Sequence, residues 1–280
     1  MNPRRLRGLV EVTATRVAGG ACHARREAVV VEEPLEIRVA GELVATTLRS
    51  PGDDEALALG LLLAEGVISS AADVGKVAHC GRPGLEGFGN VVEVTPGPGA
   101  RIDAHDLTET RRIGMMTAAC GVCGHRNIEA LMRRIEPIDV PTRMPLELLD
   151  TAVRTLGASQ PLFDRTGGLH AAVALDVDGQ TLAAAEDVGR HNAVDKVVGR
   201  LLQTGQLPRT RSTPTLLCVS SRSGFEIVQK AAVAGFALVL SVSAPSSLAI
   251  ETATASGLCL VAFAREGRVT IYAHPEHLAL

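Results

Sequence analysis

Hydrophobic and polar residues alternate along the first part of the chain in the way that β-strands require. Residues 35–39 and 43–48 alternate on either side of a turn that contains glycine, and this pattern predicts a β-hairpin. The apolar run from Glu55 to Glu65 follows a turn rich in Pro, Gly and Asp, and it predicts a helix that ends at Gly66. Residues 91–94 predict a further strand, so this region is typical of a small α+β unit.

The second half of the chain shows regularly alternating strand and helix patterns. Strands are predicted at 169–178, 181–185, 214–220, 236–242, 258–264 and 268–273, and helices at 146–157, 192–203, 224–234 and 246–256. Elements of this length that alternate along the chain predict a layered α/β sandwich. We therefore expect an α/β fold class, with an α+β unit before the sandwich.

Three prolines after residue 135 mark a boundary between these two regions. The segment before them contains one predicted helix, at 127–135, and reads as a connector. The predicted organisation is an N-terminal extension of no clear role at 1–27, a small α+β domain at 28–114, a connector at 115–145 and a larger domain at 146–280.

The composition excludes several functional classes. Hydrophobic residues make up 46% of the chain, but it has no Trp and only one Tyr, so it offers few platforms for stacking nucleic-acid bases. The net charge of −3 provides no general attraction to nucleic acid or to anionic membranes. No run reaches the roughly 18–20 apolar residues of a membrane span, and the N-terminus lacks the apolar region of a secretory signal. These features, together with isolated cysteines, predict a cytoplasmic protein.

The segment Cys120-Gly-Val-Cys123-Gly124 is the strongest chemical motif. Two thiols at this spacing serve thiol redox chemistry, sulfur transfer or half of a zinc site. The other four cysteines stand alone, and His274 and His277 are one residue too close for a paired zinc motif, so we expect no metal. A redox pair of the thioredoxin type would follow the first strands of a βαβ unit, whereas this pair lies in the connector. Redox chemistry and sulfur transfer both remain open on these grounds.

Basic side chains close in sequence to the motif favour the thiolate, which is the reactive form of cysteine. The flanking glycines allow a tight turn and the close approach of a large partner. Such a loop can accept sulfur as a persulfide and pass it on, because thiolate attack on sulfur is the common step.

Two further segments contain residues suited to anion binding. In the run from Glu186 to Lys196, Arg190 could bind phosphate and His191 could exchange protons, but an N-capped helix with internal salt bridges explains the run equally well. Arg222 lies in a loop of small polar residues after a predicted strand, which suits either a phosphate contact or a plain turn. Taken alone, the segment from Phe263 to Arg268 is an ordinary hairpin.

Together these segments resemble the FdhD family, sulfur carrier proteins needed for formate dehydrogenase activity. The resemblance runs from about residue 35 to the C-terminus. It rests on the Cys120–Gly124 motif, Leu57-Ala58-Leu59-Gly60 with Glu65-Gly66, Gly167-Gly168-Leu169-His170, Glu186 to Lys196, Arg222 with Glu226, Ser243-Ala244-Pro245, and the hairpin from Phe263 to Arg268.

The resemblance implies a sulfurtransferase that takes sulfur from a cysteine desulfurase and delivers it to the Mo-bis(molybdopterin guanine dinucleotide) cofactor of formate dehydrogenase. It places the persulfide on Cys120, with Cys123 as partner thiol. The family's cofactor-binding segment maps onto Phe263, Ala264, Arg265, Glu266, Gly267 and Arg268, and Arg190, His191 and Arg222 are further candidates for the same site.

The resemblance further implies a homodimer and a C-terminal domain similar in fold to cytidine deaminases. The zinc motif of those deaminases is absent from the sequence, so deamination is not implied. Two other functions are kept as alternatives: a dithiol-disulfide oxidoreductase, and a chaperone that binds the molybdenum cofactor without sulfur chemistry.

Overall fold

The computed structural model describes two large blocks of the chain on either side of the connector. The described residues are 8–80, 89–98, 100, 135, 138, 143–207, 215–265 and 267–280. The helix expected at 127–135 lies almost wholly outside these residues, as does the Cys120–Gly124 motif.

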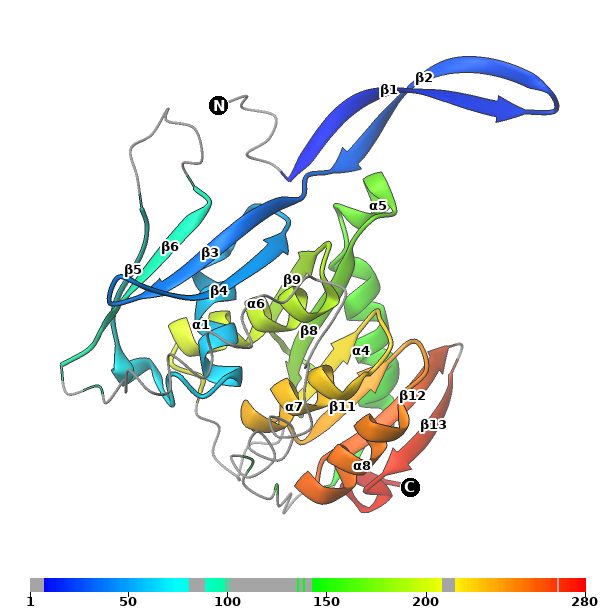
Figure 1. Cartoon of the computed structure of the whole chain (residues 1–280). Coiled ribbons are helices and arrows are strands. Elements are labelled where there is room, and N and C mark those ends of the chain that lie inside the picture. Colours follow the sequence, from blue (N-terminus) through cyan, green and yellow to red (C-terminus); the bar gives the residue numbers. More distant parts are fainter. Residues whose placement is uncertain are drawn as a thin grey trace.

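A long β-hairpin projects from the body of the molecule at the N-terminus (Figure 1). It consists of β1 (Leu9–Ala18) and β2 (Ala21–Val30), paired in antiparallel fashion along their whole length. Gly19 and Gly20 form the turn with φ angles of 57° and 80°, as the common two-residue hairpin turns require. The predicted boundary after residue 27 falls inside β2, so most of the predicted extension belongs to this hairpin.

The small α+β unit contains a four-stranded sheet with strand order β4-β3-β6-β5. Its elements are β3 (Glu33–Val39), β4 (Glu42–Arg49), α1 (Asp54–Ala64), the 3-10 helix η2 (Ala71–Asp73), β5 (Val74–His79) and β6 (Val91–Pro96). The predicted hairpin, helix and later strand of this region are all confirmed. Buried residues of β3 and β6 alternate with more exposed ones, so one face of the sheet packs against α1.

The larger sheet has six strands in the order β13-β12-β11-β10-β8-β9. Its strands are β8 (His170–Asp176), β9 (Thr181–Asp187), β10 (Thr215–Val219), β11 (Leu238–Ser241), β12 (Cys259–Arg265) and β13 (Arg268–Ala273). The helices of this half are α4 (Glu147–Ala158), α5 (Phe163–Thr166), α6 (Arg190–Gln203), α7 (Phe225–Val233) and α8 (Ser247–Ser256). β10, β11 and β12 are parallel, and the other pairings in this sheet are antiparallel.

Both faces of the larger sheet are buried. Leu217 and Val219 of β10 face the core formed with α6, α7 and α8, whereas Leu216 and Cys218 face the core formed with α4. On the α4 side, β7 (Met144–Pro145) pairs with the C-terminal strand β14 (Leu278–Ala279). The predicted α/β class is therefore confirmed, while the likeness to cytidine deaminases stays a prediction.

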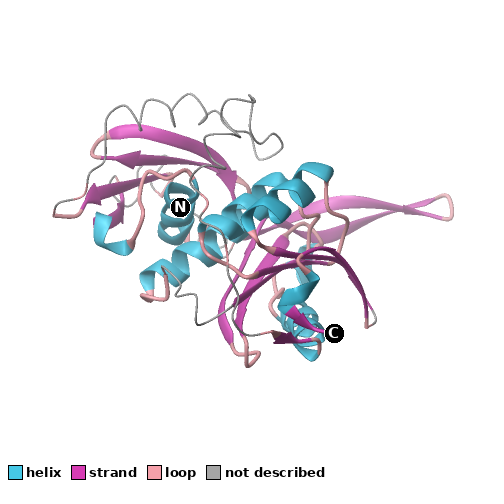
Figure 2. Cartoon of the chain, turned by 90° about the horizontal axis from the view of Figure 1, so that it is seen from below, coloured by secondary structure: helices cyan, strands magenta, loops and turns pink. Residues whose placement is uncertain are grey.

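The helices between the two sheets join both halves of the molecule into one core (Figure 2). α1 crosses α6 at two glycines, and an added Cβ at Gly60 would lie 2.0 Å from the backbone oxygen of Asp195. The reciprocal position, Gly199, would place a Cβ 1.8 Å from the backbone oxygen of Ala56. The two helix backbones are thus in direct contact. No helix within the described ranges is long and apolar enough to span a membrane.

Candidate anion site at the carboxyl ends of the strands

The carboxyl ends of four strands lie together at one edge of the larger sheet. β9 and β10 are both antiparallel to β8 and therefore share a direction, and β11 and β12 are parallel to β10. α6, α7 and α8 begin directly after β9, β10 and β11, so their N-termini lie at this same edge. In open α/β sheets, ligands bind outside the carboxyl ends of strands, which makes this edge the candidate site.

Backbone hydrogen bonds join the loops at this edge. The Ser223 N–H donates to the Ala244 oxygen at 3.2 Å, and the Ser246 N–H donates to the Ser223 oxygen at 3.1 Å. The Phe263 N–H donates to the Ser243 oxygen at 3.3 Å and so attaches β12 to the same loop. The loops that follow β10 and β11 therefore form one continuous backbone surface with β12.

The three helix N-termini give this surface a partial positive charge. The α6 and α7 N-caps are Gly189 and Gly224, neither of which caps its helix through a side chain. In α8, the Ser246 hydroxyl oxygen accepts a hydrogen bond from the Ala249 N–H at 3.2 Å. The first N–H groups of α6 and α7 are therefore suited to bind an anion.

His191 and Glu226 connect the first turns of α6 and α7. The His191 Nε2 and Glu226 Oε2 atoms are 2.5 Å apart, and both side chains are less than one-fifth exposed. Burial acts to raise the pKa of Glu226, but the His191 hydrogen bond and nearby positive charges outweigh it, so the pKa of this carboxyl is lowered. Arg190 and Lys230 contribute to that positive field.

His170 also belongs to this edge, because β8 begins where β9 ends and His170 pairs with Asp187. Burial lowers the pKa of the His170 imidazole, and the charges of Arg190 and His191 lower it further. The pKa shift therefore favours the neutral imidazole of His170 at this edge.

The other charged residues of the run from Glu186 to Lys196 are structural. Asp187 is fully buried and accepts hydrogen bonds from Ser50 N at 3.1 Å, Gly189 N at 2.8 Å and Asn192 Nδ2 at 3.0 Å, and its Oδ2 lies 2.7 Å from Lys196 Nζ. The salt-bridge interpretation of this run is thus correct for Asp187 and Lys196. Arg190 and His191 lie in the first turn of α6 and are partly exposed, and His191 is paired with Glu226.

A second buried ion pair lies beneath the His191–Glu226 pair. Lys230 Nζ donates to both carboxylate oxygens of Asp195, at 2.8 and 2.9 Å, and both side chains are buried. Burial opposes the charged form of Lys230, but the Asp195 charge and hydrogen bond prevail, so the pKa of Lys230 is raised. This pair fixes α6 to α7 behind the site.

The segment from Phe263 to Arg268, which the family resemblance assigns to cofactor binding, begins with a β-bulge at the end of β12. Phe263 has a φ of 55° and a side chain that is 45% exposed, and the pairing with β13 is irregular between Ala262 and Arg265. Ala264 points inward and is only 1% exposed. The bulge therefore turns an aromatic ring outward at the edge where the strand ends meet.

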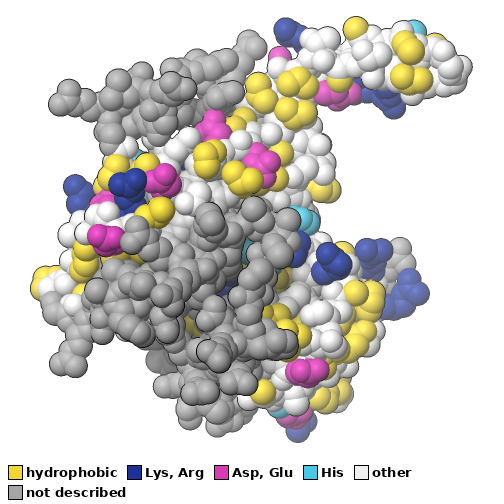
Figure 3. Space-filling view, viewed as in Figure 1, with side chains coloured by type: hydrophobic (Ala, Val, Ile, Leu, Met, Phe, Trp, Pro, Cys, Tyr) yellow, Lys and Arg dark blue, Asp and Glu magenta, His cyan; other side chains and the backbone are white. Residues whose placement is uncertain are grey.

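Arg265 and Arg268 face each other across the tip of the β12–β13 hairpin, and both are exposed. Gly267 makes the turn with a φ of 72°, while Glu266 lies outside the described residues. Basic side chains, coloured dark blue, gather around the outer end of this hairpin (Figure 3). Arg222, also exposed, lies in the loop between β10 and α7.

The cysteines in the described part of the chain are weaker candidates for sulfur transfer than Cys120 and Cys123. The Cys120–Cys123 pair itself lies outside the described residues. Burial raises the pKa of the Cys259 thiol to about 12, and it raises that of Cys218 as well. Cys22 and Cys80 are exposed but stand alone in sequence. A buried thiol with a raised pKa is a poor nucleophile, so neither buried cysteine suits sulfur transfer.

The sequence analysis used His170 and Glu226 only for the family resemblance and Ser223 only as part of a loop of small polar residues, and it gave none of them a role of its own. The Ser223 hydroxyl is fully buried at the loop junction, and its oxygen has no hydrogen-bond partner within the described part of the chain. Glu226 could have been suspected from its place in the first turn after the Ser-Arg-Ser-Gly loop. Its pairing with His191 depends on the tertiary packing of α6 and α7.

Replacing Glu226 by Gln is expected to lower the free energy of unfolding by about 1 kcal/mol at pH 7, because a charged hydrogen bond becomes a neutral one. Glu226 has a lowered pKa in the folded state, so its contribution is present above its ordinary pKa and is lost as the pH falls through the folded value. Urea unfolding of both proteins from pH 7 down to pH 3, well below the ordinary glutamate pKa, measures this difference.

The difference between wild type and Glu226→Gln should therefore shrink as the solution becomes more acidic. The control is Glu251→Gln on the exposed side of α8, which should change stability by less than about 0.5 kcal/mol at every pH. A Glu226→Gln effect that is the same at both ends of the pH range would contradict the ion pair.

The fold and this edge define a mixed α/β protein with helix N-termini and basic side chains gathered at one edge of its larger sheet, an arrangement suited to an anion. The chain belongs to the FdhD/NarQ family, whose family model matches residues 30–279. The resemblance seen in the sequence is thereby confirmed.

Similar proteins cover nearly the whole chain. It is 55% identical to the "Sulfur carrier protein FdhD" of Anaeromyxobacter dehalogenans strain 2CP-C, over 94% of this chain and 91% of that protein. It is 45% identical to the protein of the same name from Streptomyces coelicolor, over 95% of this chain and 94% of the relative. A crystal structure of a "putative formate dehydrogenase accessory protein" from Desulfotalea psychrophila has the same fold, with a TM-score of 0.73 at 22% identity, and the match covers 96% of this chain and 99% of that one.

Proposed function

We propose that this chain is a sulfur carrier that supports the maturation of formate dehydrogenase. In this proposal Cys120 receives sulfur as a persulfide from a cysteine desulfurase, and Cys123 is its partner thiol. The recipient is the Mo-bis(molybdopterin guanine dinucleotide) cofactor, which is the substrate of the transfer. Support comes from membership of the FdhD/NarQ family and from relatives named sulfur carriers that are 45% and 55% identical over nearly the whole chain.

The observation that supports a nucleotide-containing substrate most directly is the convergence of the α6, α7 and α8 N-termini at one edge of the sheet. The pyrophosphate groups of such a cofactor match basic side chains and helix N–H groups that have no side-chain cap. Arg190, His191 and Arg222 surround these termini, and Arg265 and Arg268 extend the basic surface along β12. The Ser223 hydroxyl adds a potential donor at the loop junction.

The sulfur chemistry balances with the two thiols of the motif. The Cys120 thiolate attacks the outer sulfur of the donor persulfide, the donor S–S bond breaks, and the donor cysteine leaves as a thiolate. Attack of the Cys123 thiolate on the inner sulfur of the Cys120 persulfide then releases hydrosulfide and leaves a Cys120–Cys123 disulfide. An external thiol reductant must return the disulfide to the dithiol before the next cycle.

The test is to incubate the purified chain with a cysteine desulfurase and cysteine, and to map modified peptides by mass spectrometry. We expect a gain of one sulfur atom on Cys120, abolished in Cys120→Ser and retained in Cys22→Ser, which removes an exposed cysteine of the hairpin. No gain on Cys120 or Cys123 would refute the sulfur carrier.

The two alternatives give different results in the same system. A dithiol oxidoreductase would form a reversible Cys120–Cys123 disulfide without gaining sulfur. A chaperone without sulfur chemistry would still activate formate dehydrogenase when Cys120 is replaced by Ala.

A further inference from the structure

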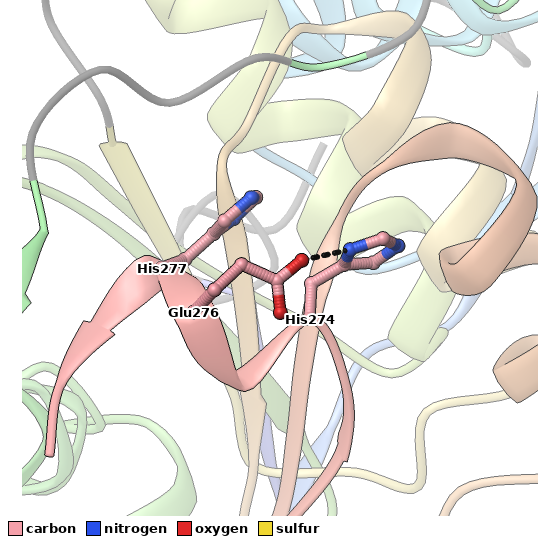
Figure 4. Close-up of side chains that lie close together, drawn as sticks. All are labelled: His274, Glu276 and His277. Carbon is pink, nitrogen blue, oxygen red and sulfur yellow. Dashed lines mark hydrogen bonds and ion pairs between the residues drawn. The ribbon is translucent and has the colours of Figure 1, made fainter.

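Three side chains with metal-ligating atoms lie together near the C-terminus (Figure 4). They are His274, Glu276 and His277, from the short 3-10 helix η3 (Pro275–His277) and the residue before it. Each offers one ligand atom, and these atoms all lie within 4.8 Å of one another. The rest of the described chain contains no second group of this kind. The cluster lies outside the anion site, on the segment that follows β13.

Each imidazole of the cluster is oriented by a backbone carbonyl. His274 Nε2 lies 3.0 Å from the Thr254 oxygen, and His277 Nδ1 lies 3.4 Å from the Ala237 oxygen. A carbonyl oxygen can only accept, so these two ring nitrogens carry the protons. Once His274 Nδ1 gives up the proton that it shares with Glu276, the lone pairs of the two rings are on His274 Nδ1 and His277 Nε2. Metal-binding histidines are commonly held in this way, with one nitrogen on a carbonyl and the other on the metal.

The spacing of the cluster is close to that of a zinc site. Two imidazoles on one tetrahedral zinc place their ring centroids about 5 Å apart, and the centroids of His274 and His277 are 5.5 Å apart. Ligand atoms around zinc are separated by about 3.3 Å, a value that lies between the 2.7 Å of His274 Nδ1 to Glu276 Oε1 and the 4.8 Å limit of the cluster. In the proposed complex the ligand atoms that are farthest apart must move closer by rotation of their side chains.

We propose that His274, Glu276 and His277 bind a zinc ion, with water as the fourth ligand. Two imidazoles and one carboxylate are a donor set that zinc takes in sites with one open position. The Glu276 side chain is 59% exposed and that of His274 is 24% exposed, so an ion can reach the cluster from solvent. A bound zinc replaces the proton shared by His274 Nδ1 and Glu276 Oε1, so binding releases that proton to solvent.

The ion would act as a structural clamp on the C-terminal segment. Thr254 belongs to α8 and Ala237 precedes β11, so the two carbonyls connect the cluster to different layers of the fold. β14 follows His277 directly, and its Leu278 pairs with Met144 of β7. Zinc would therefore stabilise the strand pair that closes the α4 side of the sheet. We expected no metal because His274 and His277 are one residue closer than the histidines of the usual zinc motif. That spacing rule does not apply to ligands on a 3-10 turn.

The test uses the whole 280-residue chain with Cys120→Ser and Cys123→Ser, so that the motif thiols cannot take the metal. Zinc is titrated against a competing chromophoric chelator, and we expect one ion per chain. His274→Gln and Glu276→Gln, both at solvent-accessible positions, should weaken binding by at least about 10-fold. The control His23→Ala removes an exposed histidine of the β1–β2 hairpin and should leave the affinity unchanged.

Cobalt supplies a second measurement that does not depend on affinity. A cobalt complex at this cluster should show the visible bands of a tetrahedral nitrogen and oxygen site and no thiolate-to-metal charge transfer. Zinc binding that survives in both His274→Gln and Glu276→Gln, the absence of one-to-one binding, or a thiolate spectrum would each overturn the proposal. The sulfur-carrier test has a separate readout, so the two proposals fail independently.

Discussion

Gly199→Ala is expected to destabilise the fold by about 3 kcal/mol or more, the upper end of the cost of overpacking a core. The new methyl group would lie 1.8 Å from the Ala56 backbone oxygen, a distance that no rotamer change can relieve. α1 and α6 would have to separate, and the core shared by the two halves of the molecule would open with them. Chemical denaturation followed by circular dichroism measures the loss.

Gly157→Ala is the matched control for this substitution. Gly157 also lies within a helix, α4, but an added Cβ there meets no atom within 4 Å. Alanine favours helix over glycine, so this variant should be more stable than wild type by up to about 1 kcal/mol. If Gly199→Ala behaved like Gly157→Ala, the backbone contact between α1 and α6 would be wrong.

The sequence predicts most elements of this fold because their patterns are local. The alternation at 43–48 correctly predicted β4, and the apolar face of the helix expected at 192–203 correctly predicted α6. The β1–β2 hairpin was missed because both strands are largely exposed and show little hydrophobic alternation. Its one local signal is the pair Gly19-Gly20, whose positive φ angles suit a two-residue hairpin turn.

Contacts between distant parts of the chain could not be predicted in the same way. Asp187 binds the Ser50 N–H across 137 positions of sequence, and Gly60 meets the Asp195 oxygen across the helix crossing. Neither contact is visible as a repeating hydrophobic pattern in the sequence. For the candidate site, the sequence identified Arg190 and His191 correctly as lying at a helix N-terminus. The convergence of three such termini follows only from the strand order.

The buried charges of α6 and α7 connect the stability of the fold to the geometry of the site. Asp195 is on α6, four residues after His191, and Lys230 is on α7, four residues after Glu226. On each helix, one turn therefore separates the residue of the His191–Glu226 pair from the residue of the Asp195–Lys230 pair. Any change that separates Asp195 from Lys230 is therefore expected to move the two helix N-termini of the candidate anion site.

Lys230→Met is expected to lower the free energy of unfolding by about 3–5 kcal/mol, the usual cost of removing one partner of a buried ion pair. Methionine retains most of the side-chain volume, but the Asp195 carboxylate loses its cation and both hydrogen bonds while it stays buried. The measurement is chemical denaturation at pH 7. The expected loss is large because burial already raises the pKa of the Asp195 carboxyl, so without Lys230 this group must either stay charged out of reach of water or take up a proton.

The double variant Asp195→Asn with Lys230→Gln separates the effect of charge from that of packing. It leaves two neutral side chains that can still form a hydrogen bond, so it should be more stable than Lys230→Met alone. Arg26→Met is the control, because it breaks the Arg26–Glu11 pair, whose side chains are 77% and 49% exposed. That surface pair should contribute less than about 1 kcal/mol. A loss of similar size in Arg26→Met and Lys230→Met would show that the Asp195–Lys230 pair is not desolvated and does not hold α6 and α7 together behind the site.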